Sequence, residues 1–530
     1  MPEEFSKINL TKVNQIRRFK IDYRTVTNLQ FTDKLNLKLQ TFTDFKAISG
    51  ILLPVTSLKV ARPVFPADLA HLNTYTSIHY PKGKMLVIVN YDLYPAISAS
   101  ITQYVMDLAY EGFYADVYRY HNGSPVHLRN FIKSKMPVKG VVFVGNLPVA
   151  WYEMSNDFHG AAEFPCDLFY MDTNGTWTDP DGDGKFSTHT GNLNPEIWVG
   201  RMWTPDQNGN NAALINDYFN RNHRFRKGLG GYSNRALAYV DDDWEHFHDC
   251  AFDLMFPAAN IEVINDPTTT DGDRYKIEIN EHRGWAQICA HSSPNGHSFK
   301  VPGESSEWIP NTYLRDTNPP NAYFYNLFAC SNARFTQAEY MGGWYIFDKP
   351  GGYSSNGLAA VGSTKTGSML LFENFYGPMA AGKVIGDAYT AWWNGLGTTH
   401  ELNEIQWYYG MVLLGDPTIN WWSGVVPVLQ QPFNNQTFNH YPRRTIFRWY
   451  PVYLPNTTVR YYIEIDAFGA RTAGKWSAET GRTWLVSGPL TDPVFEHFFV
   501  GAQRGRWRVR VKAGSIMCPW SDWRYFKYTV

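Results

Sequence analysis

Two short segments of similar design lie within residues 284–332, and they read GWAQICAHSS (284–293) and NAYFYNLFACSN (321–332). Each is an apolar run that stops at a reactive residue, the first at His291 and the second at Cys330. Apolar runs of this length, bounded by Gly, Pro and Ser, predict buried β-strands. If the strands are parallel neighbours, both residues lie at the carboxyl edge of the sheet, where open α/β folds place catalytic groups. Because a Cys beside a His is the minimal unit of thiolate catalysis, the two segments predict a cysteine nucleophile.

Both residues also have plainer interpretations. Cysteine is among the most buried residue types, and a Cys in a strand usually only packs. A single His after a strand is more often solvated or part of a cap than a catalytic base. A competing base, His297, lies beyond Pro294-Asn295-Gly296, which predicts a turn, so we favour His291.

The composition is that of a globular protein with about three domains. The chain has 530 residues, of which 44% are hydrophobic and 18% charged, and its net charge is −1. This charge gives no argument for binding nucleic acid, and no apolar run reaches the roughly 18 residues of a membrane span. The five cysteines show no CxxC spacing. They therefore indicate neither a disulfide framework nor a zinc site, and Cys330 is the candidate for a free thiol.

Strands alternate with helices over most of the chain, which predicts a doubly wound α/β fold with a mainly parallel sheet. The predicted strands are 84–89, 113–118, 138–145, 235–240, 261–264, 285–290, 322–329 and 357–364, and the predicted helices lie near 96–111, 126–134, 245–255, 273–283, 369–381 and 384–394. From about residue 425 the pattern changes to short alternating strands separated by turns, which predicts a β-sandwich with Trp449 and Trp507 in its core. The expected parts are an N-terminal extension packed on the core, two α/β subdomains and the sandwich, over residues 1–83, 84–230, 231–424 and 425–530.

Three consecutive acids, Asp241, Asp242 and Asp243, follow the predicted strand 235–240. Acids in this position either bind a metal or cap the helix that follows. We expect them to cap the helix near 245–255.

The loop DPDGDGKF (179–186) carries carboxylates at alternate positions, followed by Gly. This spacing wraps oxygen ligands around Ca²⁺. Position 12 of an EF-hand would fall on Thr190, so the loop is not an EF-hand. We expect a non-helical, structural calcium site completed by Asp172 or Glu196, with an Asx-rich surface turn as the alternative. No organic cofactor is expected, and the candidate ligands are Asp172, Asp179, Asp181, Asp183, Lys185 and Glu196.

A series of motifs resembles the gingipain family of caspase-like cysteine peptidases. They occur in the order PCDLFYMD, DPDGDGKF, PEIWVGR, LAYVDDDW, QICAHSS, YNLFACSNARF, LAAVGST and LLGDP, over about residues 84–422. The combination is specific, although each motif alone is weak. The segments IFRWYPV, YYIEID and WRVRVKAG resemble a fibronectin type III-like module, a kind of module that often follows secreted bacterial peptidases.

The resemblance implies a role for each matching residue. His291 matches the catalytic His and Cys330 the nucleophile, and the backbone N–H groups of Cys330 and Ser292 would form the oxyanion hole. The thioester formed by Cys330 would then be hydrolysed by water. Asp167 would lie near the S1 pocket and favour Arg or Lys at P1 through a charge-assisted pair.

The chain departs from the family beside the catalytic His, where Gly usually stands on both sides and this chain has Ala290 and Ser292. A Gly after the His permits a positive φ and a close approach of the substrate carbonyl. Two functions are therefore expected: a cysteine endopeptidase acting on protein or peptide substrates, or a catalytically inactive relative used for binding, adhesion or assembly. The sandwich would dock to a surface or to another protein. An extracellular or cell-surface location is expected. The cytoplasm is the alternative, because residues 1–12 contain no apolar signal core.

Overall fold

The computed structural model describes residues 39–45, 55–58 and 82–529, apart from positions 122, 159, 207, 228, 230–232, 301–305, 318, 349–354, 422–425, 453–457, 470–473, 482, 502–503 and 515. Most of the N-terminal extension expected over residues 1–83 lies outside these ranges. Its described pieces do pack on the core. The rings of Phe42 and Phe45 lie 5.6 and 5.7 Å from that of Trp151, and a short strand pairs with the edge of the main sheet.

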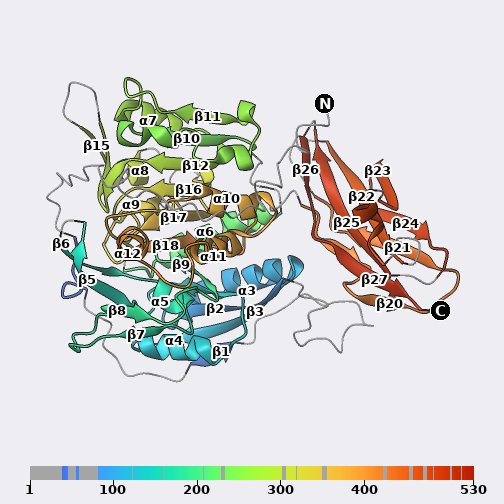
Figure 1. Ribbon diagram of the computed structural model, residues 1–530, viewed down its shortest axis with the longest axis horizontal. Helices are drawn as coiled ribbons and strands as arrows, with labels where there is room; N and C mark the ends of the chain where they lie inside the picture. Colours follow the sequence, from blue (N-terminus) through green and yellow to red (C-terminus); the bar gives the residue numbers. More distant parts are fainter. Residues whose placement is uncertain are drawn as a thin grey trace.

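One sheet of 11 strands forms the centre of the described α/β part (Figure 1). Its strands are rich in Val, Ile, Leu and aromatic residues, and most are buried along their whole length, as expected for a sheet covered on both faces. Their order across the sheet is β1 (Thr56–Leu58), β3 (Phe113–Tyr120), β2 (Gly83–Asn90), β4 (Gly140–Val144), β9 (Trp198–Met202), β18 (Met411–Gly415), β17 (Ala359–Ser363), β16 (Ala322–Phe328), β12 (Arg283–Cys289), β10 (Ala236–Val240) and β11 (Ile261–Ile264).

Apart from the edge strand β1, which is antiparallel to β3, the sheet consists of two parallel halves that run in opposite directions. β18 is parallel to β9 and antiparallel to β17, so the direction reverses between β18 and β17. The strands from β17 to β11 are parallel to one another, which confirms the parallel arrangement expected for the segment with His291 and Cys330. The expected boundary at residue 230 falls between elements of one continuous sheet.

The helices are α3 (Tyr94–Tyr110), α4 (Pro125–Lys133), α5 (Leu168–Met171), α6 (Ala212–Arg226), α7 (Gly272–Glu278), α8 (Asn311–Asp316), α9 (Met341–Trp344), α10 (Phe372–Ala380), α11 (Ile385–Asn394) and α12 (Leu402–Tyr408). α3 packs on α6, and α10 packs on α11. None of the described helices combines the length and the apolar character needed to cross a bilayer. The short strands outside the main sheet are β5 (Trp151–Asp157), β6 (Gly160–Pro165), β7 (Thr176–Thr178), β8 (Thr188–Thr190), β13 (His291–Ser293), β14 (Gly296–Phe299) and β15 (Glu307–Pro310).

The helix predicted near residues 245–255 is wrong. The segment forms short 3₁₀ turns, η2 (Asp242–Phe247), η3 (Phe252–Leu254) and η4 (Ala258–Asn260). His248, Cys250 and Ala251 have positive φ values of 49°, 54° and 62°. Left-handed residues of this kind interrupt a right-handed helix.

The C-terminal part is built from two packed sheets (Figure 1). The first contains β19 (Leu429–Gln431), β21 (Arg444–Trp449) and β24 (Val494–Phe498), and the second contains β20 (Gln436–Phe438), β27 (Arg524–Tyr528), β25 (Arg504–Ala513), β22 (Val459–Phe468) and β23 (Leu485–Leu490), with β26 (Ile516–Trp520) beside β25. A 3₁₀ turn, η6 (Ser477–Thr480), follows β22.

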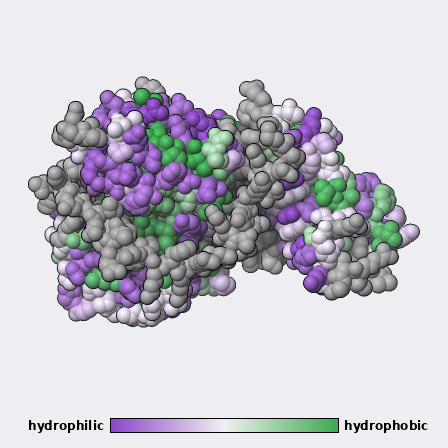
Figure 2. Space-filling model, turned by 45° about the horizontal axis from the view of Figure 1, so that its top comes forward, coloured by the Kyte–Doolittle hydropathy of each residue, from purple (hydrophilic) through white to green (hydrophobic). Residues whose placement is uncertain are grey.

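The core of this part is aromatic, and the predicted core residues Trp449 and Trp507 are confirmed at 1% and 0% exposure. The Phe447 ring of the first sheet lies 5.1 Å from the Trp507 ring of the second, so the two sheets pack face to face. The likeness to fibronectin type III modules stays a prediction. Apolar side chains also reach the surface of the C-terminal part, where Figure 2 shows separate green patches on the right. Phe498 and Val500 are exposed at 55% and 88%.

Candidate active site

Strands β12 and β16 bring His291 and Cys330 to the same edge of the sheet. They are parallel neighbours with Cys289 paired to Phe328, so each reactive residue lies two positions beyond that pair. The Oγ of Ser292 donates a hydrogen bond to the carbonyl oxygen of Cys330 at 2.5 Å, which joins the two segments directly. Cys330 is 7% exposed, and the His291 side chain is 19% exposed. The adjacency predicted from the two sequence segments is therefore confirmed.

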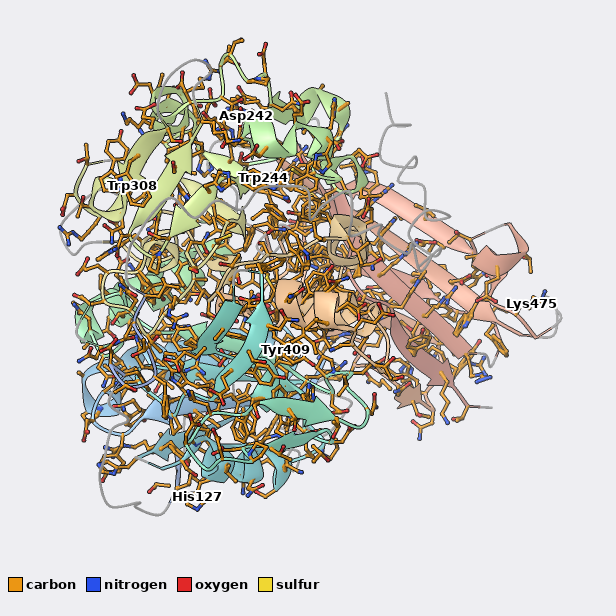
Figure 3. The ribbon with its side chains drawn as sticks, turned by 60° about the vertical axis from the view of Figure 1, so that its left-hand side comes forward. His127, Asp242, Trp244, Trp308, Tyr409 and Lys475 are labelled. Carbon is orange, nitrogen blue, oxygen red and sulfur yellow. The ribbon has the colours of Figure 1, made fainter. Side chains whose placement is uncertain are left out.

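A carboxylate completes this group of residues. β10 pairs with the other side of β12, with Val240 opposite Cys289, and its chain continues into η2. There His291 donates through Nε2 to Oδ2 of Asp243 at 2.7 Å. The next residue, Trp244, is labelled beside Asp242 in Figure 3. Its buried ring lies 4.7 Å from the imidazole of His291 and 5.7 Å from the ring of Phe328 on β16.

The capping role expected for the acids after β10 is not what the structure shows. Asp241, at the N-terminus of η2, makes no side-chain cap, and Asp243 instead fixes the orientation of His291. The sequence did contain a signal that could have placed these acids beside His291. The acids end a strand that neighbours the strand of His291, and the edge rule that paired His291 with Cys330 applies to them as well.

The charge of Asp243 is held by two donors. Burial opposes ionisation, but the hydrogen bonds from His291 and Lys300 outweigh it, and the pKa of Asp243 lies below its usual value. The neighbouring Asp241 is different, because burial followed by repulsion from Asp242 raises its pKa to about 8. Since Nε2 of His291 is bound to Asp243, Nδ1 is the nitrogen that remains for exchanging a proton with a thiol.

The loop after Cys330 is held by the end of β17. Ser331 has a left-handed φ of 56°, an uncommon conformation for a residue other than Gly. Its N–H donates to the carbonyl of Lys365 at 2.9 Å, and the N–H of Ala333 donates to the carbonyl of Ser363 at 2.9 Å. Non-Gly residues with this backbone geometry cluster at active sites, where surrounding contacts hold them in place.

The competing residues are deeply buried. His297 on β14 is 0% exposed, shares a 2.8 Å hydrogen bond with the Tyr345 hydroxyl, and has its pKa lowered to about 3 by burial. It is therefore a neutral core residue. The other four cysteines are buried at 2% exposure or less: Cys166, Cys250, Cys289 and Cys518.

Asp167 lies away from solvent with its charge already paired. Its two oxygens accept hydrogen bonds from Nε and Nη2 of Arg201 at 2.8 and 2.5 Å, and the residue is 2% exposed. A bidentate pair of this kind is a strong, charge-assisted contact. The S1 role expected for Asp167 would require a substrate cation to compete with this buried arginine.

The candidate calcium ligands are not gathered into one group. Asp172 bonds to His189 at 2.5 Å and to the N–H groups of Asn174 and Gly175. Glu196 accepts from the N–H of Thr173 at 2.7 Å. Neither completes the 179–186 loop, so the expected ligand set does not fit a single ion. The groups that meet at the loop are Glu153, Glu163, Asp181, Asp183 and the ammonium of Lys185.

The model of the family described as Peptidase family C25 matches residues 83–422. This is more than half of the chain, and the chain belongs to that family of cysteine peptidases. The match confirms the resemblance to gingipains drawn from the sequence motifs.

Solved structures with some likeness include the Arg-specific cysteine proteinase gingipain R (RGPB), at 12% identity, with 84% of this chain and 98% of that chain covered and a TM-score of 0.49. A complex of Porphyromonas gingivalis RgpB pro- and mature domains has 12% identity, coverage of 84% and 100%, and a TM-score of 0.47. A structure described only as a protease has 13% identity, coverage of 86% and 98%, and a TM-score of 0.46. Likeness at this level does not transfer substrates or activity to this chain. No curated protein matches the chain.

Proposed function

We propose that the chain is an active cysteine peptidase in which Cys330 is the nucleophile, His291 the general base and acid, and Asp243 the residue that orients His291. The main support for the proposal is the 2.7 Å hydrogen bond from His291 Nε2 to Asp243. It lies at the edge of the sheet where β16 ends just before Cys330. A nucleophile, a base and a third group that orients the base form the recurring constellation of covalent catalysis.

The chemistry follows from these positions. Nδ1 of His291 takes the proton of the Cys330 thiol, and the sulfur forms a bond to the scissile carbonyl carbon. The backbone N–H groups of Cys330 and Ser292 are the proposed donors to the oxyanion. The imidazolium gives its proton to the leaving amine as the C–N bond breaks. Water, deprotonated by His291, then hydrolyses the thioester and restores the thiol.

The test is site-selective alkylation. Wild-type protein is treated with a limiting amount of a peptidyl acyloxymethyl ketone, and the labelled cysteine is identified by peptide mass mapping. Labelling of Cys330 alone is expected, because burial raises the pKa values of Cys166 and Cys250 and raises that of Cys518 to about 12. The four buried cysteines therefore serve as controls within the same molecule.

His291→Ala should abolish this labelling while leaving the melting temperature close to that of the wild type. If the folded wild-type protein is not labelled at Cys330, or if Cys330 reacts equally well without His291, the chain is the inactive, binding relative. Peptides with Arg, Lys, Leu or Phe at P1 should be compared in the same assay. The basic P1 preference linked to Asp167 stays a prediction, as does an extracellular or cell-surface location.

A further inference from the structure

The ammonium group of Lys185 lies at the centre of the acidic loop. Its Nζ is 2.7 Å from an oxygen of Glu153, 2.9 Å from one of Glu163 and 2.8 Å from one of Asp183. The two glutamates come from the β5–β6 hairpin and the aspartate from the loop itself. One cation thus joins two segments that carry like charges.

The same carboxylates have the spacing of a metal site. Oxygens of Glu153, Asp181 and Asp183 lie within 4.8 Å of one another. A calcium ion would need several oxygens at about 2.3–2.6 Å. The ammonium already contacts Glu153 and Asp183, so a divalent cation entering this cluster would meet a positive charge among its own ligands.

Two acids of the loop, Asp179 and Asp183, also accept hydrogen bonds from backbone N–H groups of the loop. The carboxylate of Asp179 accepts from the N–H groups of Gly182 and Gly184 at 2.8 and 2.9 Å. The Oδ1 of Asp183 accepts from the N–H of Lys185 at 2.9 Å. These bonds fold the loop back on itself without an ion.

We propose that Lys185 takes the place of a structural metal ion, so that the 179–186 loop is closed by the chain's own ammonium and becomes a divalent-cation site only when that ammonium is removed. The cluster also anchors the N-terminal segment, because the second oxygen of Glu163 accepts the N–H of Phe42 at 2.8 Å. The closure therefore fastens residues 40–45 to the core without any metal. This inference does not depend on peptidase activity.

The experiment compares melting temperatures in chelator and in millimolar Ca²⁺. For the wild type we expect no difference. For Lys185→Met we expect a lower melting temperature in chelator, since like charges are left facing each other, and a recovery of at least about 2–4 °C when Ca²⁺ is added. Mg²⁺ should restore less, because it requires near-ideal octahedral geometry.

Two variants serve as controls. Lys185→Arg keeps the positive charge and should not respond to Ca²⁺. Lys276→Met removes another lysine held by two carboxylates, those of Asp273 and Glu307, and should not respond either. A Lys185→Met protein whose melting temperature is equally insensitive to Ca²⁺ would overturn the proposal.

The wild type provides a test that does not depend on the folding of Lys185→Met. Saturable Tb³⁺ binding to the wild type, lost in Asp183→Asn, would show that the loop takes a metal with Lys185 in place and would overturn the proposal. Equal Tb³⁺ signals from the wild type and Asp183→Asn support it.

Discussion

Replacing His291 with alanine is expected to lower kcat by about 10⁴- to 10⁶-fold, and Asp243→Asn by about 10²- to 10⁴-fold. Without His291 no group takes the thiol proton or returns one to the leaving amine. Without the Asp243 carboxylate the imidazole remains, but it loses the acceptor that holds its Nε2–H and the negative charge that stabilises the imidazolium. The measurement is kcat on a fluorogenic peptide that the wild type cleaves.

The double variant is the sharper comparison. In the proposed mechanism Asp243 acts through His291, so the protein with both substitutions should be no slower than His291→Ala within a few-fold. Losses that add up would mean that Asp243 contacts the substrate or the reacting atoms independently.

Asp242→Asn is the matched control for the loss of a carboxylate on the same turn. No hydrogen bond joins Asp242 to His291 in the described part of the chain, and we expect a loss of less than about tenfold. If Asp242→Asn and Asp243→Asn are equally impaired, the effect comes from the charge of the segment and not from orientation of the imidazole. Melting temperatures of all variants should be measured to exclude unfolding.

Much of the central sheet and the positions of His291 and Cys330 could be predicted from the sequence, because buried parallel strands are continuous apolar runs. Once the strands that precede His291 and Cys330 are taken as parallel neighbours, both residues must lie at the same edge of the sheet. Asp243 was interpreted as part of a cap because the segment after β10 was expected to be helical. The left-handed residues that break it, His248, Cys250 and Ala251, are not residue types that signal a turn.

Ion pairs between residues that are far apart in the sequence also could not be predicted from local patterns. The spacing of acids in 179–186 predicts a Ca²⁺ site, which stays a prediction. The structure places two glutamates of the β5–β6 hairpin beside the loop and the ammonium of Lys185 among the acids. Similarly, Asp167 reads as a free carboxylate until β9 places Arg201 against it. In both cases the ion pair joins residues from different elements, Glu153 and Glu163 to Lys185 and Asp167 to Arg201, and sequence spacing alone does not contain such pairs.

Asp416 lies in the turn Gly415-Asp416-Pro417 at the end of β18, and replacing it is expected to have a large effect on stability. It is 0% exposed and accepts hydrogen bonds from Tyr104 of α3 at 2.7 Å and from Asn222 and Arg226 of α6 at 2.8 and 2.7 Å. This carboxylate therefore fastens two helices to the turn that closes the sheet. Gly415 permits the close turn, since it has a φ of 90° and a Cβ there would lie 2.2 Å from the carbonyl oxygen of Leu358.

Asp416→Asn is expected to lower the free energy of unfolding by about 3–5 kcal/mol, because it leaves the buried guanidinium of Arg226 with one carboxylate partner, Glu111, in place of two. The measurement is the melting temperature, with a fall of about 10 °C expected. Asp217→Asn, which breaks a more exposed ion pair with Arg221 on the same helix, should change the stability by no more than about 0.5 kcal/mol.

The pH dependence of the stability difference between the wild type and Asp416→Asn tests independently whether the charge of Asp416 is responsible. Burial opposes the charge of Asp416, but Arg226 and the hydrogen bonds from Thr418 and Tyr104 outweigh it, so its pKa in the folded protein is lowered. A lowered pKa means that the unfolded chain binds the proton more readily, so the carboxylate's contribution is complete above the unfolded pKa of about 4 and is lost as the pH falls through the folded value. The difference in the free energy of unfolding between the wild type and Asp416→Asn should therefore be constant near neutral pH and become smaller below about pH 4. A gap that stays constant into acid would show that the substitution acts through packing and not through the charge of Asp416.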